Sequence, residues 1–154
     1  MRIALVEHVL NAAALLDEVA SPSCGATSLF LGTVRNVNEG RAVTGIEYTA
    51  YAAMATAELD RIAHEAAERF GTDRIVIEHR IGTLTLGETS IAIVVAHERR
   101  TPAMEASRYL IEEIKKRVPI WKREHYADGT REWVDPTRGA PPVQPAAHVA
   151  EVVG

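Results

Sequence analysis

Cysteine is almost absent from this chain of 154 residues, which holds a single one, Cys24. One thiol cannot close an internal disulfide, so the class of small disulfide-stapled secreted domains is excluded and a reducing, cytoplasmic location is expected. Long apolar runs are also lacking, since none approaches the roughly 20 residues that span a bilayer. The N-terminus has neither the apolar stretch nor the cleavage site of a secretory signal. The sequence therefore predicts a cytoplasmic protein that does not enter a membrane.

Metal-ligand and phosphate-loop patterns are missing too. The segment His64–Glu68 resembles the zinc-protease helix motif only superficially, because its second histidine position is a glutamate, and the other histidines show no ligand spacing. There is no glycine-rich phosphate loop and no Gly-x-Ser-x-Gly nucleophile elbow. We therefore expect no metal and no cofactor. The net charge of −4 argues against a nucleic-acid binder, which usually carries a basic balance.

What the chain does have is enough apolar residues, 47% of the total, for one well-buried core and too little length for two ordinary domains. We expect a single domain over residues 1–135. Beyond it, residues 136–154 are rich in alanine and proline and predict an extended C-terminal tail.

Two long helices are predicted. Residues 54–70 carry apolar residues at helical spacing, and Gly71 follows where a left-handed cap is wanted. A second helix is expected from Thr101, a good N-cap followed by proline, to Pro119, which ends it.

Several strands are predicted around these helices. Residues 89–96 form an apolar run with β-branched residues, typical of a strand buried on both faces. Residues 26–35 and 43–51 flank the turn chemistry of 36–40 and are interpreted as a hairpin. A late strand is expected at 130–135. The order of elements predicts an α+β fold.

Positive charge is concentrated in residues 99–123. This segment holds eight basic and three acidic residues, a net +5, which leaves nine basic and eighteen acidic residues, a net −9, in the rest of the chain. Like charges repel unless something offsets them, so a local anion site is indicated.

Lys115 and Lys116 should face different surroundings. Lys115 falls about 40° from Ile111 and about 20° from Met104 around the helix, on the edge of the apolar arc, whereas Lys116 falls about 140° from Ile111, towards water. Partial desolvation would lower the pKa of Lys115 and fit it for proton transfer. The alternative is a lysine that merely snorkels at the helix end, favoured by the helix dipole.

Arg99 and Arg100 precede the second helix, where unpaired N–H groups already favour anions, so they are candidates for phosphate or carboxylate binding; a solvated pair is the alternative. Arg35 is a third candidate for anion binding.

Trp121 could stack on a planar ring, although core packing is the commoner role. Cys24 has no neighbouring base in the sequence, and we expect it to be inert.

Four blocks, Phe30–Asn38, His79–Gly82, Met104–Ala106 and Lys115–Glu124, resemble those of the large, catalytic subunit of molybdopterin synthase, the MoaE family. The similarity runs from about Gly25 to Val134. It implies an α/β hammerhead-type α+β fold with a mixed or antiparallel sheet and two main helices.

The resemblance also implies a sulfurtransferase. A small ubiquitin-like sulfur-carrier subunit, with a thiocarboxylate on its C-terminal glycine, would insert its tail and donate two sulfurs to cyclic pyranopterin monophosphate, which forms the dithiolene of molybdopterin in molybdenum cofactor biosynthesis. Family members pair as homodimers within a heterotetramer. The anionic reactants explain a cationic pocket.

By position, Lys115 and Lys122 match the two lysines of the family site and are the expected catalytic residues. Arg100 matches the arginine of the family's His-Arg pair, whose histidine position is Arg99 here unless His97 takes it. The full set of expected substrate-binding residues is Thr33, Val34, Arg35, Arg99, Arg100, Lys115, Lys122, Arg123 and Glu124. The main alternative is a non-catalytic module that binds an acidic protein tail through the same pocket.

Overall fold

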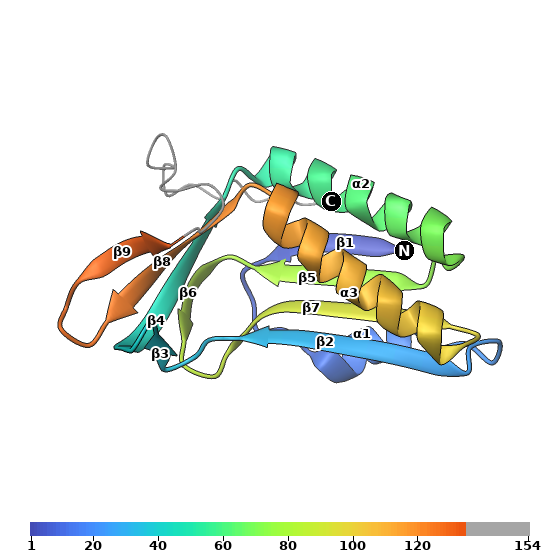
Figure 1. The fold of residues 1–154 in the computed structure, drawn as a ribbon, viewed down its shortest axis with the longest axis horizontal. Coiled ribbons are helices and arrows are strands. Elements are labelled where there is room, and N and C mark those ends of the chain that lie inside the picture. Colours follow the sequence, from blue (N-terminus) through green and yellow to red (C-terminus); the bar gives the residue numbers. More distant parts are fainter. Residues whose placement is uncertain (135–154) are drawn as a thin grey trace.

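The structure is a computed structural model that describes residues 1–134, and these residues form two β-sheets and three helices (Figure 1). In chain order the elements are β1 (Arg2–Val6), α1 (Ala12–Val19), β2 (Ala26–Thr33), β3 (Val37–Asn38), β4 (Arg41–Ala50), α2 (Ala52–Phe70), β5 (Ile75–Arg80), β6 (Gly82–Thr85), β7 (Thr89–His97), α3 (Arg100–Arg117), β8 (Ile120–Tyr126) and β9 (Arg131–Val134).

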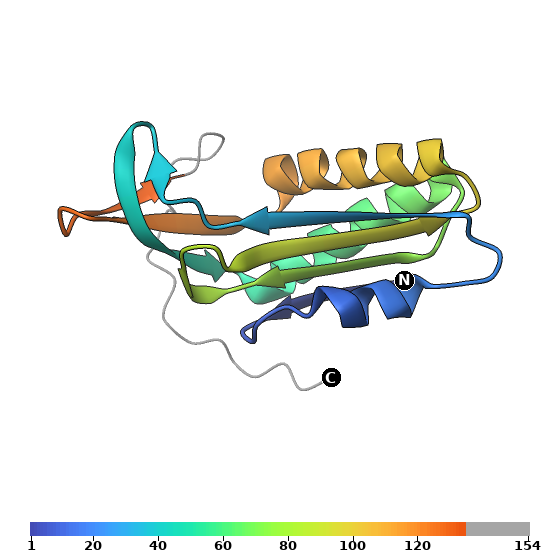
Figure 2. The ribbon, with the colours of Figure 1, turned by 90° about the horizontal axis from the view of Figure 1, so that it is seen from below.

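The first sheet has the strand order β1-β5-β7-β2, with β1 parallel to β5 and the other pairs antiparallel. Helices α2 and α3 cover one face and α1 covers the other (Figures 1 and 2). In β7, Ile93 and Val95 pack towards α2 and α3, while Val94 and Ala96 pack towards α1. This confirms the prediction of a strand buried on both faces at 89–96.

The second sheet is antiparallel and has the order β3-β4-β8-β9, with β6 also paired to β4. It stands at one end of the first sheet in Figure 1. The predicted hairpin of 26–35 with 43–51 is wrong, because β2 pairs with β7 while β4 pairs with β3, β6 and β8. The register shifts between Gly32 and Thr33, and the chain leaves the first sheet there.

Helix α2 confirms the predicted helix at 54–70. Leu59, Ile62, Ala63 and Ala66 of its apolar stripe are fully buried, and Phe70 at its end is partly buried. Gly71 adopts φ 72° and donates its N–H to the carbonyl of Ala67, which closes the last turn.

Helix α3 begins two residues earlier than predicted. Arg99 is its N-cap and makes no side-chain capping bond, so the assignment of Thr101 as N-cap is wrong. The predicted inward position of Met104 is also wrong, since that side chain is 63% exposed and Ala103 and Ala106 occupy the buried positions.

The C-terminal end of α3 is tied to α2 by Arg117. Its guanidinium donates to Glu58 at 2.8 Å and to both carboxylate oxygens of Glu65 at 2.6 and 2.9 Å. Because Lys115 is two residues away, this ion pair fixes the turn from which the lysine projects.

Within residues 1–134, every helix is too short or too polar to cross a membrane. The predicted tail at 136–154 lies outside the described residues.

Candidate active site

A cavity of about 500 Å³ opens where the two sheets meet the last turns of α3. Strands of both sheets contribute to it, which is why residues remote in sequence meet there. Its lining consists of Phe30, Gly32, Thr33, Arg35, Val37, Ile46, Tyr48, His79, Ser90, Ile91, Ile111, Ile114, Lys115, Val118, Ile120, Lys122, Glu124 and Val134.

Three cations from three different segments line this cavity. Arg35 follows β2, Lys115 lies in the last turn of α3, and Lys122 projects from β8. Their convergence was predicted from charge and from the family resemblance, together with that of Arg100, which does not line the cavity. Cations gathered in one concave site favour anionic ligands and stabilise negative charge that develops during a reaction.

The predicted difference in facing between the adjacent lysines agrees with the structure. Lys115 lines the cavity, whereas Lys116 lies 3.4 Å from Glu113 on the exposed side of α3. The expected burial of Lys115 is wrong, however, because the side chain is exposed at the cavity mouth. The reason is that Met104, which was taken to mark the inward arc, is itself exposed.

Strand β8 separates the predicted trio at 122–124. Side chains alternate along a strand, so Lys122 and Glu124 share the cavity face, with Lys122 Nζ 3.5 Å from Glu124 Oε1. Arg123 points to the opposite face, where it donates to Glu47 at 2.7 Å and its guanidinium lies 5.2 Å from the centre of the Trp133 ring. Arg123 therefore does not line this cavity, and its expected role in substrate binding stays a prediction.

Thr33 and Val34, both expected to bind substrate, lie in different surroundings. Thr33 lines the cavity. Val34 is 4% exposed and packs in the core of the second sheet. Its N–H donates to the backbone carbonyl of Glu88, and its own carbonyl accepts the N–H of Gly87. Val34 therefore holds its two neighbours in place rather than contacting a ligand with its side chain.

A polar floor of the cavity was missed by sequence reasoning. Tyr48, His79 and Ser90 sit in strands of both sheets and line the cavity. Burial lowers the pKa of His79 to about 4, so the imidazole is neutral at physiological pH, and burial raises the pKa of Tyr48. The only sequence signal was that His79 fell within one of the four blocks.

Arg99 and Arg100 do not reach this cavity. They stand at the opposite end of α3, fifteen residues before Lys115, which is about 22 Å along a helix. Both side chains are exposed. A single chain therefore does not bring them to the other cations.

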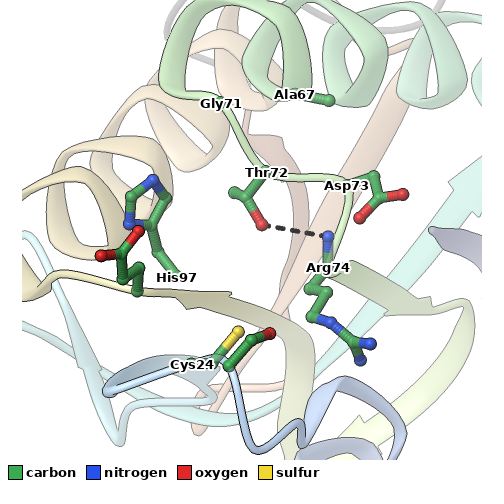
Figure 3. Close-up of a pocket in the computed structure, with 9 residues that line it drawn as sticks. Cys24, Ala67, Gly71, Thr72, Asp73, Arg74 and His97 are labelled. Carbon is green, nitrogen blue, oxygen red and sulfur yellow. Dashed lines mark hydrogen bonds between the residues drawn. The ribbon is translucent and has the colours of Figure 1, made fainter.

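His97 borders a different, more open hollow near the start of α3, with a volume of about 470 Å³ (Figure 3). Its Nδ1 accepts the N–H of Arg99, and it does not line the cationic cavity. Cys24, which has no basic neighbour in the sequence, lies on the wall of this same hollow. Of lysine and arginine, the lining of this hollow contains only Arg74, whereas three such residues line the other cavity.

Trp121 is 6% exposed and packs edge-on against Tyr51, which confirms core packing over ring stacking on a ligand. Among residues 1–134 no three His, Cys, Asp or Glu side chains are grouped so as to hold a metal ion.

Comparison with known proteins gives consistent matches. The family model described as MoaE protein matches residues 5–117. The molybdopterin synthase catalytic subunit of Emericella nidulans is 40% identical over 133 residues, which cover 86% of this chain and 68% of that protein.

Solved structures share the fold. Molybdopterin synthase from Staphylococcus aureus aligns with a TM-score of 0.79 at 32% identity, covering 84% of this chain and 94% of that one. A complex of subunits 1 and 2 of the molybdopterin-converting factor from Helicobacter pylori aligns with a TM-score of 0.70 at 23% identity, covering 90% and 93%.

Proposed function

This chain belongs to the MoaE family of molybdopterin synthase catalytic subunits, and we propose that the cavity between its two sheets is where sulfur is transferred. The donor is the thiocarboxylate on the C-terminal glycine of a small ubiquitin-like subunit. The acceptor is cyclic pyranopterin monophosphate, which receives two sulfurs, loses its cyclic phosphate ring and gains the dithiolene of molybdopterin.

The observation that carries this proposal is the meeting of Arg35, Lys115 and Lys122 in one cavity of a chain whose net charge is −4. Such a cluster is unfavourable on its own, because the three charges repel one another. The phosphate of the acceptor, the thiocarboxylate of the donor and the charge that develops on sulfur and oxygen all offset that repulsion.

Each cation has a role that fits its position. Lys115, at the exposed mouth, can meet the incoming tail and exchange a proton with solvent. Lys122 is held 3.5 Å from Glu124, which orients its ammonium towards the cavity. Arg35 offers a planar fork that suits phosphate, and Thr33 beside it adds a hydroxyl.

Arg99 and Arg100 fit this function through a second copy of the chain. An anion in the cavity is about 20 Å or more from these residues within one chain, so only a partner copy can bring them near. This agrees with a homodimer at the centre of a heterotetramer that carries small subunits. The Helicobacter pylori relative was solved as a complex of two subunits.

Reconstitution tests the function directly. The chain is mixed with thiocarboxylated small subunit and cyclic pyranopterin monophosphate, and molybdopterin is measured. We expect two sulfurs transferred for each molecule of product, and no product when the small subunit ends in an ordinary carboxylate. Saturable binding of the small subunit without any dithiolene would instead support a non-catalytic module for acidic tails.

A mixing experiment tests the second copy. Lys115→Ala and Arg100→Ala are each expected to be inactive alone. A mixed dimer holds one cavity with both residues intact, so activity should return when the two variants are unfolded, mixed and refolded together. Failure to recover activity, with mixed dimers present, would place Arg100 outside the site.

A single free cysteine and a thiocarboxylate donor suit a reducing compartment, so we assign the reaction to the cytoplasm.

A further inference from the structure

Three polar side chains on the cavity wall are more than nine-tenths buried. His79 is 7% exposed, Ser90 6% and Glu124 3%. Among the described residues the only other buried polar or charged side chains are Glu78 and Ser107, which lie elsewhere. Burying polar groups costs free energy unless they find partners, so their gathering at one cavity needs an explanation.

His79 and Ser90 each donate to a backbone carbonyl and keep a hydrogen-bond acceptor. His79 is neutral, and its Nδ1 lies 2.8 Å from the carbonyl of Arg80, to which it can only donate; its Nε2 therefore keeps a lone pair. Ser90 donates its hydroxyl hydrogen to the carbonyl of Gly32 at 3.1 Å, which leaves the lone pairs on Oγ.

Glu124 is an acceptor that lacks a full set of partners. Its Oε1 lies 3.5 Å from Lys122, and its Oε2 is buried with no hydrogen-bond partner among the described residues. A buried carboxylate oxygen without a donor is costly, and it is the kind of group that a bound ligand can satisfy.

Tyr48 shows that these acceptors form one cluster. Its ring packs against the His79 ring with centroids 5.2 Å apart, and its hydroxyl neighbours Ser90. The negative charge of Glu124 is close enough to contribute to the raised pKa of Tyr48. Tyr48 also stands opposite Lys122 in the β4–β8 pairing. The acceptor cluster is thus beside the cations yet distinct from them in chemistry.

We infer that His79, Ser90 and Glu124 form an acceptor subsite that binds the N–H-rich fused ring of the substrate, while the cations bind its phosphate and the donor's thiocarboxylate. Phosphate and thiocarboxylate oxygens are acceptors and gain nothing from this subsite. A pterin ring carries an exocyclic amine and ring N–H groups, which need acceptors when they leave water. The identity of the ring rests on the proposed function.

The two halves of the site are tested with separate probes on the full chain. Pterin without a phosphate and inorganic phosphate without a ring are titrated by calorimetry into the wild type and into Ser90→Ala, Glu124→Gln and Arg35→Ala. Ser107→Ala is the matched control, because Ser107 is equally buried, at 6%, and does not line the cavity. Thermal unfolding checks that each variant is folded.

We expect Ser90→Ala and Glu124→Gln each to weaken pterin binding about tenfold, the loss of one hydrogen bond to a buried site. Phosphate binding should be unchanged in Ser90→Ala and no weaker in Glu124→Gln, which removes a negative charge. Arg35→Ala should weaken phosphate binding and spare pterin.

The inference is overturned if the wild type does not bind pterin, if both acceptor variants behave like Ser107→Ala, or if they weaken both probes equally. Unfolding of Ser90→Ala leaves the isosteric Glu124→Gln to decide. Pterin binding in a chain that makes no molybdopterin would refute the proposed function and leave the subsite standing. Normal turnover with unaltered pterin binding in the variants would refute the subsite and leave the proposed function standing.

Discussion

Arg123 and Glu47 face each other across the β4–β8 pairing on the side of the second sheet turned away from the cavity, joined at 2.7 Å. Both side chains are mostly buried, at 21% and 25% exposure, and Arg123 also stacks on Trp133. A residue in the middle of the Lys122–Glu124 trio is thus committed to holding the sheet together.

Replacing Arg123 with alanine is therefore expected to lower stability and spare catalysis. We expect the free energy of unfolding in urea to fall by about 1–2 kcal/mol, because Glu47 loses its partner in a partly buried place. The kcat/KM of the folded enzyme should stay within about twofold of wild type. Arg131→Ala is the control, since Arg131 is exposed on β9 and its loss should change stability little. A hundredfold fall in kcat with normal stability would return Arg123 to the active site.

Lys115 and Lys116 offer a comparison of neighbours. Lys115→Ala should abolish or reduce product formation by about 10²–10³-fold, the range for removing a group that stabilises developing charge. Because the side chain is exposed, circular dichroism and the melting temperature should remain near wild type. Lys116→Ala, on the other face of the same turn, should be close to normal. Equal damage from both substitutions would contradict the assignment of facing.

The facing of Lys115 was readable from the sequence because it depends on one helix with a fixed angle per residue. Strand β8 was not recognised in advance, so its period of two was not applied to residues 120–126. Applied there, it would have sent Arg123 away from Lys122 and Glu124. Apart from the short neighbouring strand β3, the partners of β2 and β4 lie far along the chain, and no local pattern encodes which of these strands pair.

The acceptor subsite was hidden for the same reason. His79 lies between Glu78 and Arg80, and Ser90 stands at the start of the apolar run of β7, so neither residue is marked out by its neighbours in the sequence. Only the second sheet, packed across the ends of β5 and β7, turns those positions into cavity wall. The concentration of basic residues was visible in the sequence composition. The role of neutral polar residues depends on their burial, which only the fold determines.

Arg117 and Glu65 should make stability depend on acid. Hydrogen bonds from Arg117 lower the pKa of Glu65 to about 2, so the folded state binds fewer protons than the unfolded state below the ordinary value of 4.5. The stabilisation is present above pH 4.5 and is lost as the pH falls from 4.5 towards 2. Arg117→Met should lower stability at pH 7 by about 1–3 kcal/mol and flatten the dependence in that window. Denaturant unfolding at pH 7 and pH 3.5 measures both; parallel curves for variant and wild type would contradict the pairing.

His79 predicts a second pH effect in a higher window. Burial lowers its pKa from 6.5 to about 4, so between these values the unfolded chain takes up a proton that the folded chain refuses, and stability falls as the pH falls. From pH 7 to pH 5 this group should cost about 2 kcal/mol of unfolding free energy. His79→Asn, which keeps a donor for the Arg80 carbonyl, should remove most of that slope even if its absolute stability is lower. His8→Asn is the matched control, because His8 also places Nδ1 near the carbonyl of the next residue, at 2.9 Å, but is exposed. If the slope between pH 7 and pH 5 survives in His79→Asn, or disappears in His8→Asn, the imidazole of His79 is not the buried neutral group on which the acceptor subsite depends.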